Sequence, residues 1–120
     1  MRAVRYAENF GANLEGIHEF LLTQDISSAT DRLTRLLAEL DQLATLIAEQ
    51  PGLGRPAQFV IDRTPRVTAA RRAVAALQGR AQVEALREYT LGDYWVLYAV
   101  QTDAVVLLAI RSARQRGYRL

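Results

Sequence analysis

Apolar residues recur at helical spacing through the first half of the chain. Residues 2–6 alternate weakly between polar and apolar positions, which predicts a short first strand. The apolar positions that follow share one helical face, and they are Phe10, Leu14, Ile17, Phe20 and Leu21. A longer leucine-rich stripe runs over residues 33–47 and ends at the Pro51-Gly52 pair. The pattern predicts an antiparallel helix hairpin over about residues 10–49.

A short connection between the two helices is expected at residues 25–28, where Ser27 or Ser28 would cap the second helix. Four leucines of the hairpin are expected in the core: Leu21, Leu22, Leu36 and Leu40. Any apolar side chain that the hairpin leaves exposed would suit an amphipathic partner helix.

The second half of the chain predicts a short helix and then strands. Thr64 and Pro65 can cap and open a helix over about residues 63–80, which Gly79 would end. Residues 83–91, 94–100 and 104–110 predict three strands, and Gly92-Asp93 is a two-residue hairpin signal. The last strand is apolar on both faces and is therefore expected in a central position. The predicted fold class is α+β: a strand, a helix hairpin, a short helical insert and a three-stranded antiparallel meander.

Charge divides unevenly along the chain. Residues 1–50 hold four arginines and eight acids (4 − 8 = −4), whereas residues 51–120 hold eleven arginines and five acids (11 − 5 = +6). Every basic residue is arginine, the side chain best suited to bidentate contact with carboxylate or phosphate. The pattern indicates either an acidic or polyanionic partner for the second half, or a solvated basic face.

The composition excludes several chemistries. The chain has no cysteine, so disulfides and thiolate metal sites are absent, and His18 alone cannot build an imidazole metal cluster. Neither a metal nor a cofactor is expected. The first residues do not form a secretory signal, and the most apolar stretch is interrupted by Gln101, Thr102 and Asp103. We expect a single cytoplasmic domain over residues 1–120 that has no membrane partner.

Several local strings, in this order, resemble the RelE/ParE toxin superfamily of type II toxin–antitoxin systems. The matching strings are residues 51–56 (PGLGRP), 86–89 (LREY), 94–98 (YWVLY) and 106–110, the last followed by Arg111 and Arg114. The similarity covers nearly the whole chain and is closer to ParE-like than to RelE-like members. Residues 57–82 resemble the helical insert of a longer subgroup, the plasmid-stabilisation proteins. The resemblance implies a toxin that a cognate antitoxin, through an amphipathic and acidic segment, holds inactive.

The resemblance leaves two targets open, because ParE-like toxins act on DNA gyrase and RelE-like toxins cleave mRNA on the ribosome. In a RelE-like enzyme the catalytic residues would be Arg87, Tyr98, Arg111 and Arg114. Arginine is a poor general base, lysine is absent, and Ser112 and Ala113 stand where many relatives carry histidine. Tyr98 would then be the only proton-transfer group among them. These absences favour a binding toxin that acts on gyrase; a third possibility is a non-toxic remnant that only binds antitoxin.

Contact with the antitoxin or the target is expected from six arginines: Arg55, Arg87, Arg111, Arg114, Arg116 and Arg119. Some of these residues also have structural interpretations. Arg55 could tie carbonyl groups in its turn, and Arg87 could pair with Glu84 or Glu88. Tyr98 could be a bonded sheet residue, Trp95 could anchor the core or one sheet face, and His18 could be a polar surface residue.

Overall fold

The computed structural model describes residues 1–57, 83–115 and 117–119. Two helices, α1 (Glu8–Gln24) and α2 (Ile26–Glu49), follow the first strand, β1 (Ala3–Tyr6), and a 3-10 turn, η1 (Pro51–Leu53), follows α2. The remaining strands are β2 (Arg55–Pro56), β3 (Val83–Leu91), β4 (Tyr94–Gln101) and β5 (Ala104–Ser112). The order of strand, helix hairpin and antiparallel meander agrees with the α+β class that the sequence predicts. The helix expected over residues 63–80 lies outside the described residues.

The five strands form one mixed sheet in the order β1-β5-β4-β3-β2. The meander β3–β4–β5 is antiparallel, β1 pairs in parallel with β5, and β2 adds a two-residue edge to β3. Gly92 turns the β3–β4 hairpin with a φ of 59°, a conformation that glycine adopts without strain. The last strand lies inside the sheet, between β1 and β4, while β4 occupies the middle position.

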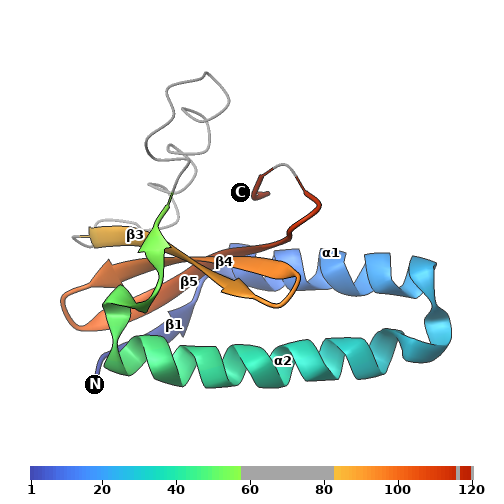
Figure 1. The fold of residues 1–120 in the computed structure, drawn as a ribbon, viewed down its shortest axis with the longest axis horizontal. Helices are drawn as coiled ribbons and strands as arrows, with labels where there is room; N and C mark the ends of the chain where they lie inside the picture. Colours follow the sequence, from blue (N-terminus) through green and yellow to red (C-terminus); the bar gives the residue numbers. More distant parts are fainter. Residues whose placement is uncertain (58–82, 116, 120) are drawn as a thin grey trace.

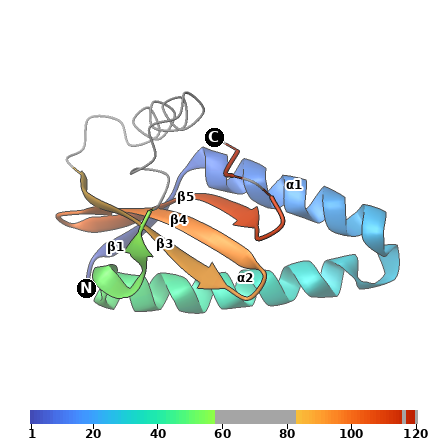
Figure 2. The same ribbon diagram turned by 45° about the horizontal axis from the view of Figure 1, so that its top comes forward.

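Both helices pack on one face of the sheet, and their apolar stripes form the main core with alternate residues of β4 and β5 (Figures 1 and 2). Fully buried side chains of this core include Phe10, Leu43, Ile47, Val96, Val105 and Leu107. Each buried aliphatic side chain contributes on the order of 1.5–3 kcal/mol through the area that it removes from water. The leucine stripe thus forms the hairpin and attaches it to the sheet.

A smaller apolar cluster covers the opposite face of the sheet. It contains Leu97 and Ala99 of β4, Leu108 and Ala109 of β5, and Ala57. Each face of β5 packs into one of the two clusters, which explains why the strand is apolar on both faces, as the sequence pattern predicts. The register shifts between Leu97 and Tyr98, where β4 pairs first with Ala109 and then with Leu107. This irregularity lets two successive β5 residues, Leu108 and Ala109, point to the same face.

Three apolar residues of the helix hairpin are exposed, although the sequence pattern predicts that they face the core. Phe20, Leu22 and Leu37 keep 54%, 38% and 46% of their surface accessible, so the expectation of burial is wrong for them. The joined ends of α1 and α2 extend beyond the β3–β4 hairpin, which leaves Phe20 and Leu22 without a strand to cover them (Figure 1). Leu21, Leu36 and Leu40 are buried as expected.

Asp25 caps the second helix, and the expected cap at Ser27 or Ser28 is wrong. The Asp25 carboxylate accepts hydrogen bonds from the Ser27 backbone N–H at 3.0 Å and from the Ser27 hydroxyl at 2.6 Å. These bonds lower the pKa of Asp25, and a bond from the Ser28 side chain adds to the effect. A single residue separates α1 from α2, so the same aspartate that ends the first helix begins the second.

Among the described residues, no helix is long and apolar enough to cross a membrane.

Loss of the Asp25 cap should lower the thermal stability of the protein in a pH-dependent way. Because the pKa of Asp25 is lower in the folded chain, ionised Asp25 stabilises the fold above its unfolded pKa of about 3.9, and this stabilisation disappears as pH falls through the folded pKa. We expect Asp25→Ala to lower Tm at pH 7, and Asp25→Asn to lower it less, since an amide also caps. Calorimetry at pH 7 and pH 3 measures both, and a Tm difference that is as large at pH 3 as at pH 7 would contradict the interpretation.

Candidate functional site

A buried tyrosine joins the sheet to the turn after α2. The Tyr98 hydroxyl donates a hydrogen bond to the Pro51 carbonyl at 2.7 Å and accepts one from the Gly54 backbone N–H at 2.9 Å. Tyr98 has no exposed surface, and burial raises its pKa, so the hydroxyl keeps its proton at neutral pH. The hydroxyl therefore acts as a structural link between β4 and η1.

Arg87 reinforces the same turn from the neighbouring strand. It lies opposite Tyr98 in the β3–β4 register, and its Nε donates to the Gly54 carbonyl at 2.8 Å. Its Nη2 donates to the Gly52 carbonyl at 3.1 Å and also to the Gly54 carbonyl. The sequence suggested that Arg55 bonds the carbonyl groups of this turn. In the structure Arg87 makes these bonds instead.

Gly54 fits this network because it has no side chain. A Cβ at this position would lie 2.8 Å from the Tyr98 hydroxyl and would overlap the Glu88 carbonyl. The backbone φ of Gly54 is −74°, which any residue can adopt. Glycine is required here because the Gly54 backbone lies close to the Glu88 carbonyl of β3 and to the Tyr98 hydroxyl of β4.

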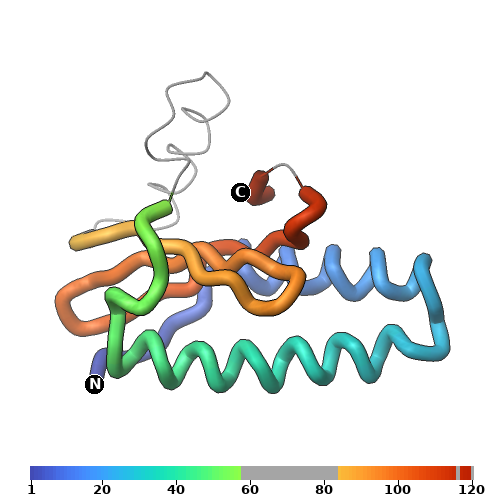
Figure 3. Tube along the Cα trace, in the orientation of Figure 1, coloured from blue at the N-terminus to red at the C-terminus, as the bar shows by residue number. Residues whose placement is uncertain are grey.

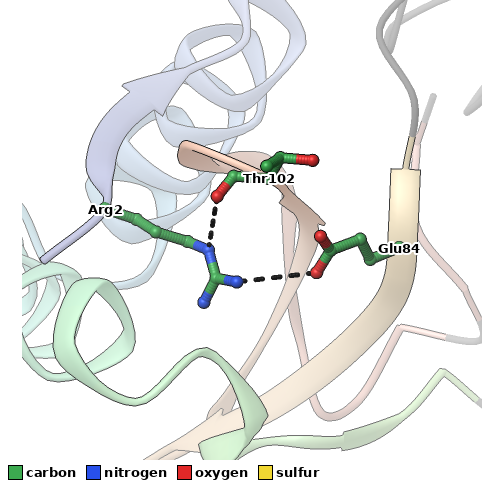
Figure 4. A network of polar contacts seen from close by, with 3 residues as sticks. All are labelled: Arg2, Glu84 and Thr102. Atoms are coloured by element: carbon green, nitrogen blue, oxygen red, sulfur yellow. Dashed lines mark hydrogen bonds and ion pairs between the residues drawn. The ribbon is translucent and has the colours of Figure 1, made fainter.

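The expected pairing of Arg87 with Glu84 or Glu88 is wrong. Glu84 instead faces Arg2, whose Nη2 lies 3.5 Å from its carboxylate and whose Nε donates to the Thr102 carbonyl at 3.2 Å (Figure 4). The buried Glu88 accepts a hydrogen bond from the Tyr118 hydroxyl at 2.6 Å. Glu84 and Glu88 thus attach the two ends of the chain to β3.

Two arginines flank Trp95 on the sheet face opposite the helices. The Arg55 guanidinium carbon lies 4.3 Å from the centre of the Trp95 ring, and that of Arg111 lies 5.7 Å from it. Trp95 and Arg111 are direct partners in the β4–β5 register, and Arg55 reaches Trp95 from β2. Trp95 is partly buried and serves as the sheet-face anchor that its sequence context suggested. Arg55, expected in a turn, belongs to an edge strand.

Arg111 is held by the C-terminal segment. Its Nη1 donates to the Gln115 carbonyl at 2.9 Å, and its guanidinium lies 5.1 Å from the centre of the Tyr118 ring. Burial is the main cause that raises the pKa of Tyr118 well above its usual value, and the bond to Glu88 adds to it. The Nε of Arg111 is buried and has no hydrogen-bond partner in the described part of the chain.

Two asparagines of α1 hold the C-terminal segment at its far end. The amides of Asn9 and Asn13 each donate to the Arg119 carbonyl at 3.0 Å. The same side chains bond the part of β5 that extends beyond β1: Asn9 donates to the Leu108 carbonyl at 3.1 Å, and Asn13 accepts from the Ile110 N–H at 3.1 Å. The segment consequently runs on the side of the sheet away from α2 (Figure 3).

Sequence reasoning did not find Asn9 and Asn13. The only signal was their four-residue spacing, which places two amides on one side of a helix. β1 ends at Tyr6, so the rest of β5 has no partner strand on that side. The two asparagine side chains bond the β5 backbone there instead.

The sheet separates the residues of the expected catalytic set. Tyr98 belongs to the core cluster beneath the helices, and Arg87 lies beside it in register. Arg111 contacts Trp95 and Tyr118 on the opposite face, and Arg114 is exposed in the turn after β5. Of the expected contact arginines, Arg55, Arg114 and Arg119 are exposed, and Arg116 lies outside the described residues.

Metal-binding side chains do not gather in the described residues, where no group of three or more His, Asp or Glu could hold an ion. His18 lies on α1 and is partly buried.

Comparison with known proteins identifies the family of this chain and a solved structure that shares its fold. The sequence model of the family described as "ParE toxin of type II toxin-antitoxin system, parDE" matches residues 4–117. The chain belongs to the ParE toxin family. No curated protein matches the sequence. Among solved structures, a chain of the "Chromosomal ParDE TA system from P. aeruginosa" has the same fold, with a TM-score of 0.60 and 13% identity over 93% of this chain and 96% of that chain.

Substitution of Gly54 should destabilise the protein much more than substitution of its neighbour Gly52. A Cβ at Gly54 overlaps a backbone carbonyl, whereas one at Gly52 meets nothing within 4 Å. We expect Gly54→Ala to cost about 1–3 kcal/mol in the free energy of unfolding, as overpacking does, and Gly52→Ala to change it by less than about 0.5 kcal/mol. Urea denaturation measures both, and equal effects would show that the turn around Gly54 rearranges to accommodate the added methyl group.

Proposed function

We propose that this chain is the toxin of a type II toxin–antitoxin system, that it acts in the cytoplasm by binding DNA gyrase, and that a cognate antitoxin neutralises it. The observation that carries the proposal is the family match over residues 4–117, supported by the shared fold of a ParDE chain. We further propose that residues 1–120 act as a single toxin domain, with a helical insert at about residues 63–80.

The antitoxin site in this proposal is the outer surface of the helix hairpin. Phe20, Ile26 and Leu37 are exposed by 54%, 78% and 46%, which is unusual for large apolar side chains on two adjacent helices. Ile26 and Leu37 are about three helical turns apart and therefore lie on one side of α2. An amphipathic antitoxin helix would bury such residues on binding.

The C-terminal arginines supply the charged part of the antitoxin site in this proposal. Arg114 and Arg119 are exposed, and the segment 111–120 contains four arginines and no acid. An acidic antitoxin segment would complement this charge, and contacts of this kind weaken as salt rises.

The antitoxin complex should depend on Leu37 and not on Leu46. Both leucines lie on α2 and are about equally exposed, at 46% and 45%, but nine residues place them on opposite sides of the helix. We expect Leu37→Ser to raise the Kd of the toxin–antitoxin complex by roughly ten- to a hundredfold, the loss of about one buried leucine. Leu46→Ser is the matched control. Calorimetric titration with the cognate antitoxin measures both, and equal losses, or no complex at all, would oppose the proposed surface.

A binding toxin is supported over a ribonuclease by the state of the expected catalytic groups. The Tyr98 hydroxyl is buried and bonded on both sides, and Arg87 is bonded to turn carbonyls. Arg111 lies on the other face of the sheet, and the chain has no lysine. General acid–base cleavage of RNA needs a proton-transfer group within reach of the substrate, and these residues do not provide one.

Expression of the chain without antitoxin distinguishes the possible functions. We expect growth arrest with inhibition of gyrase supercoiling by the purified protein and no ribosome-dependent cleavage of transcripts. Tyr98→Phe should leave this inhibition intact at temperatures at which the variant is folded, because the hydroxyl serves the turn. Transcript cleavage that falls by about 10²–10⁴-fold in Tyr98→Phe, with supercoiling unaffected, would instead indicate a RelE-like enzyme. Absence of growth arrest would indicate a remnant that only binds antitoxin.

A further inference from the structure

The cluster formed by Arg55, Trp95 and Arg111 combines an aromatic ring with two guanidinium planes. Its residues come from three strands of the sheet: Arg55 from the β2 edge, Trp95 from the start of β4, and Arg111 from the end of β5, with β3 between β2 and β4. A guanidinium over an indole ring is attracted by the negative face of the ring. The attraction fixes Arg55 at the sheet surface although the side chain is exposed.

Arg55 keeps its hydrogen-bonding capacity. No described residue accepts a hydrogen bond from its guanidinium, and its recorded contact is with the face of Trp95. A guanidinium whose donors are not used within the protein can bind an anion with two hydrogen bonds. Arg111 differs, because two of its bonds go to the backbone of Ser112 and Gln115. Arg55 is thus the anion-binding member of the cluster, and Arg111 is a positioning residue for Trp95.

Among the residues that the structure describes, the acids near the cluster leave its positive charge in excess. Glu88, on the same sheet face, is buried and binds the Tyr118 hydroxyl. Asp93 is exposed in the hairpin that leads into β4. The exposed arginines on the segments around them are Arg55, Arg114 and Arg119.

We propose that Arg55, Trp95 and Arg111 bind a strand of single-stranded nucleic acid. A phosphate would occupy the N–H edge of Arg55, and a base would stack on the outer plane of its guanidinium or on the exposed part of the indole. An acidic polypeptide could use the charge of Arg55, but its acidic side chains offer no planar ring for the stacked surfaces, whereas every nucleotide carries both a phosphate and a base. A nucleic-acid strand uses both features, which is why the cluster favours it.

This site lies on the sheet face opposite the helices, whereas the apolar part of the proposed antitoxin site is on the helix hairpin. The two proposals share only the charge of the C-terminal arginines Arg114 and Arg119, and neither residue belongs to the cluster. Its chemistry concerns the free toxin and requires neither gyrase nor antitoxin. A negative result for this site would therefore leave the proposed action on gyrase untouched, and a negative gyrase assay would leave this site untouched.

Trp95 is the only tryptophan of the chain, so its fluorescence reports directly on the site. The full-length protein is titrated with an oligothymidine of about 12 nucleotides, a length within the range that single-strand sites cover. We expect quenching of Trp95 with an affinity that falls as salt rises. Arg55→Gln should weaken binding by roughly five- to a hundredfold and reduce the slope of log K against log salt by about 0.7, the effect of one lost phosphate contact.

Arg35→Gln is the matched control, since Arg35 is equally an exposed arginine but lies on α2. It should bind the oligonucleotide as the unaltered protein does. Trp95→Leu, followed by anisotropy of a labelled oligonucleotide, should weaken binding as Arg55→Gln does. Polyglutamate of equal length tests the acidic polypeptide. Absence of quenching, equal losses in Arg35→Gln and Arg55→Gln, or competition by polyglutamate as strong as by unlabelled oligonucleotide would each overturn the proposal.

Discussion

The fold depends on the need to cover both faces of β4 and β5. These strands carry apolar side chains on each side, so neither face of the sheet can be left to water. The helix hairpin covers one face with long leucine and isoleucine side chains. On the other face the structure describes a thinner cover of small residues and Tyr118, held in place by Glu88 and by Arg111. The two faces therefore acquire different chemistry: the helix-covered face is a closed apolar core, and the other face carries Trp95 and Tyr118 next to arginine side chains.

Because successive residues of a strand lie on opposite faces of the sheet, residues close together in sequence contact different parts of the protein. Arg87 and Glu88 are neighbours, yet one bonds the turn after α2 while the other binds Tyr118 near the C-terminus. Trp95 and Tyr98 differ in the same way, since the tyrosine lies under the helices and the tryptophan on the opposite face. A strand alternates its side chains between two environments, and a functional set drawn from sequence alone mixes them.

Much of the fold could be predicted because it rests on local signals. The leucine periodicity gave the hairpin its correct extent, and the Gly92-Asp93 pair marked the β3–β4 turn. Periodicity does not reveal where a sheet ends, and so the expectation that Phe20 and Leu22 are buried was wrong. The contacts of Trp95 with Arg55 and Arg111 depend on strand register, including the irregularity at Leu97 and Tyr98. Register is a property of long-range pairing, which no short window of sequence contains.

Asn9 and Asn13 connect the two faces physically. They lie on α1, one of the helices with the exposed apolar residues, and their amides hold both the free part of β5 and the carbonyl of Arg119. The segment that they hold places Tyr118 over Arg111, which in turn contacts Trp95. A continuous chain of contacts therefore runs from the first helix to the arginine-flanked tryptophan.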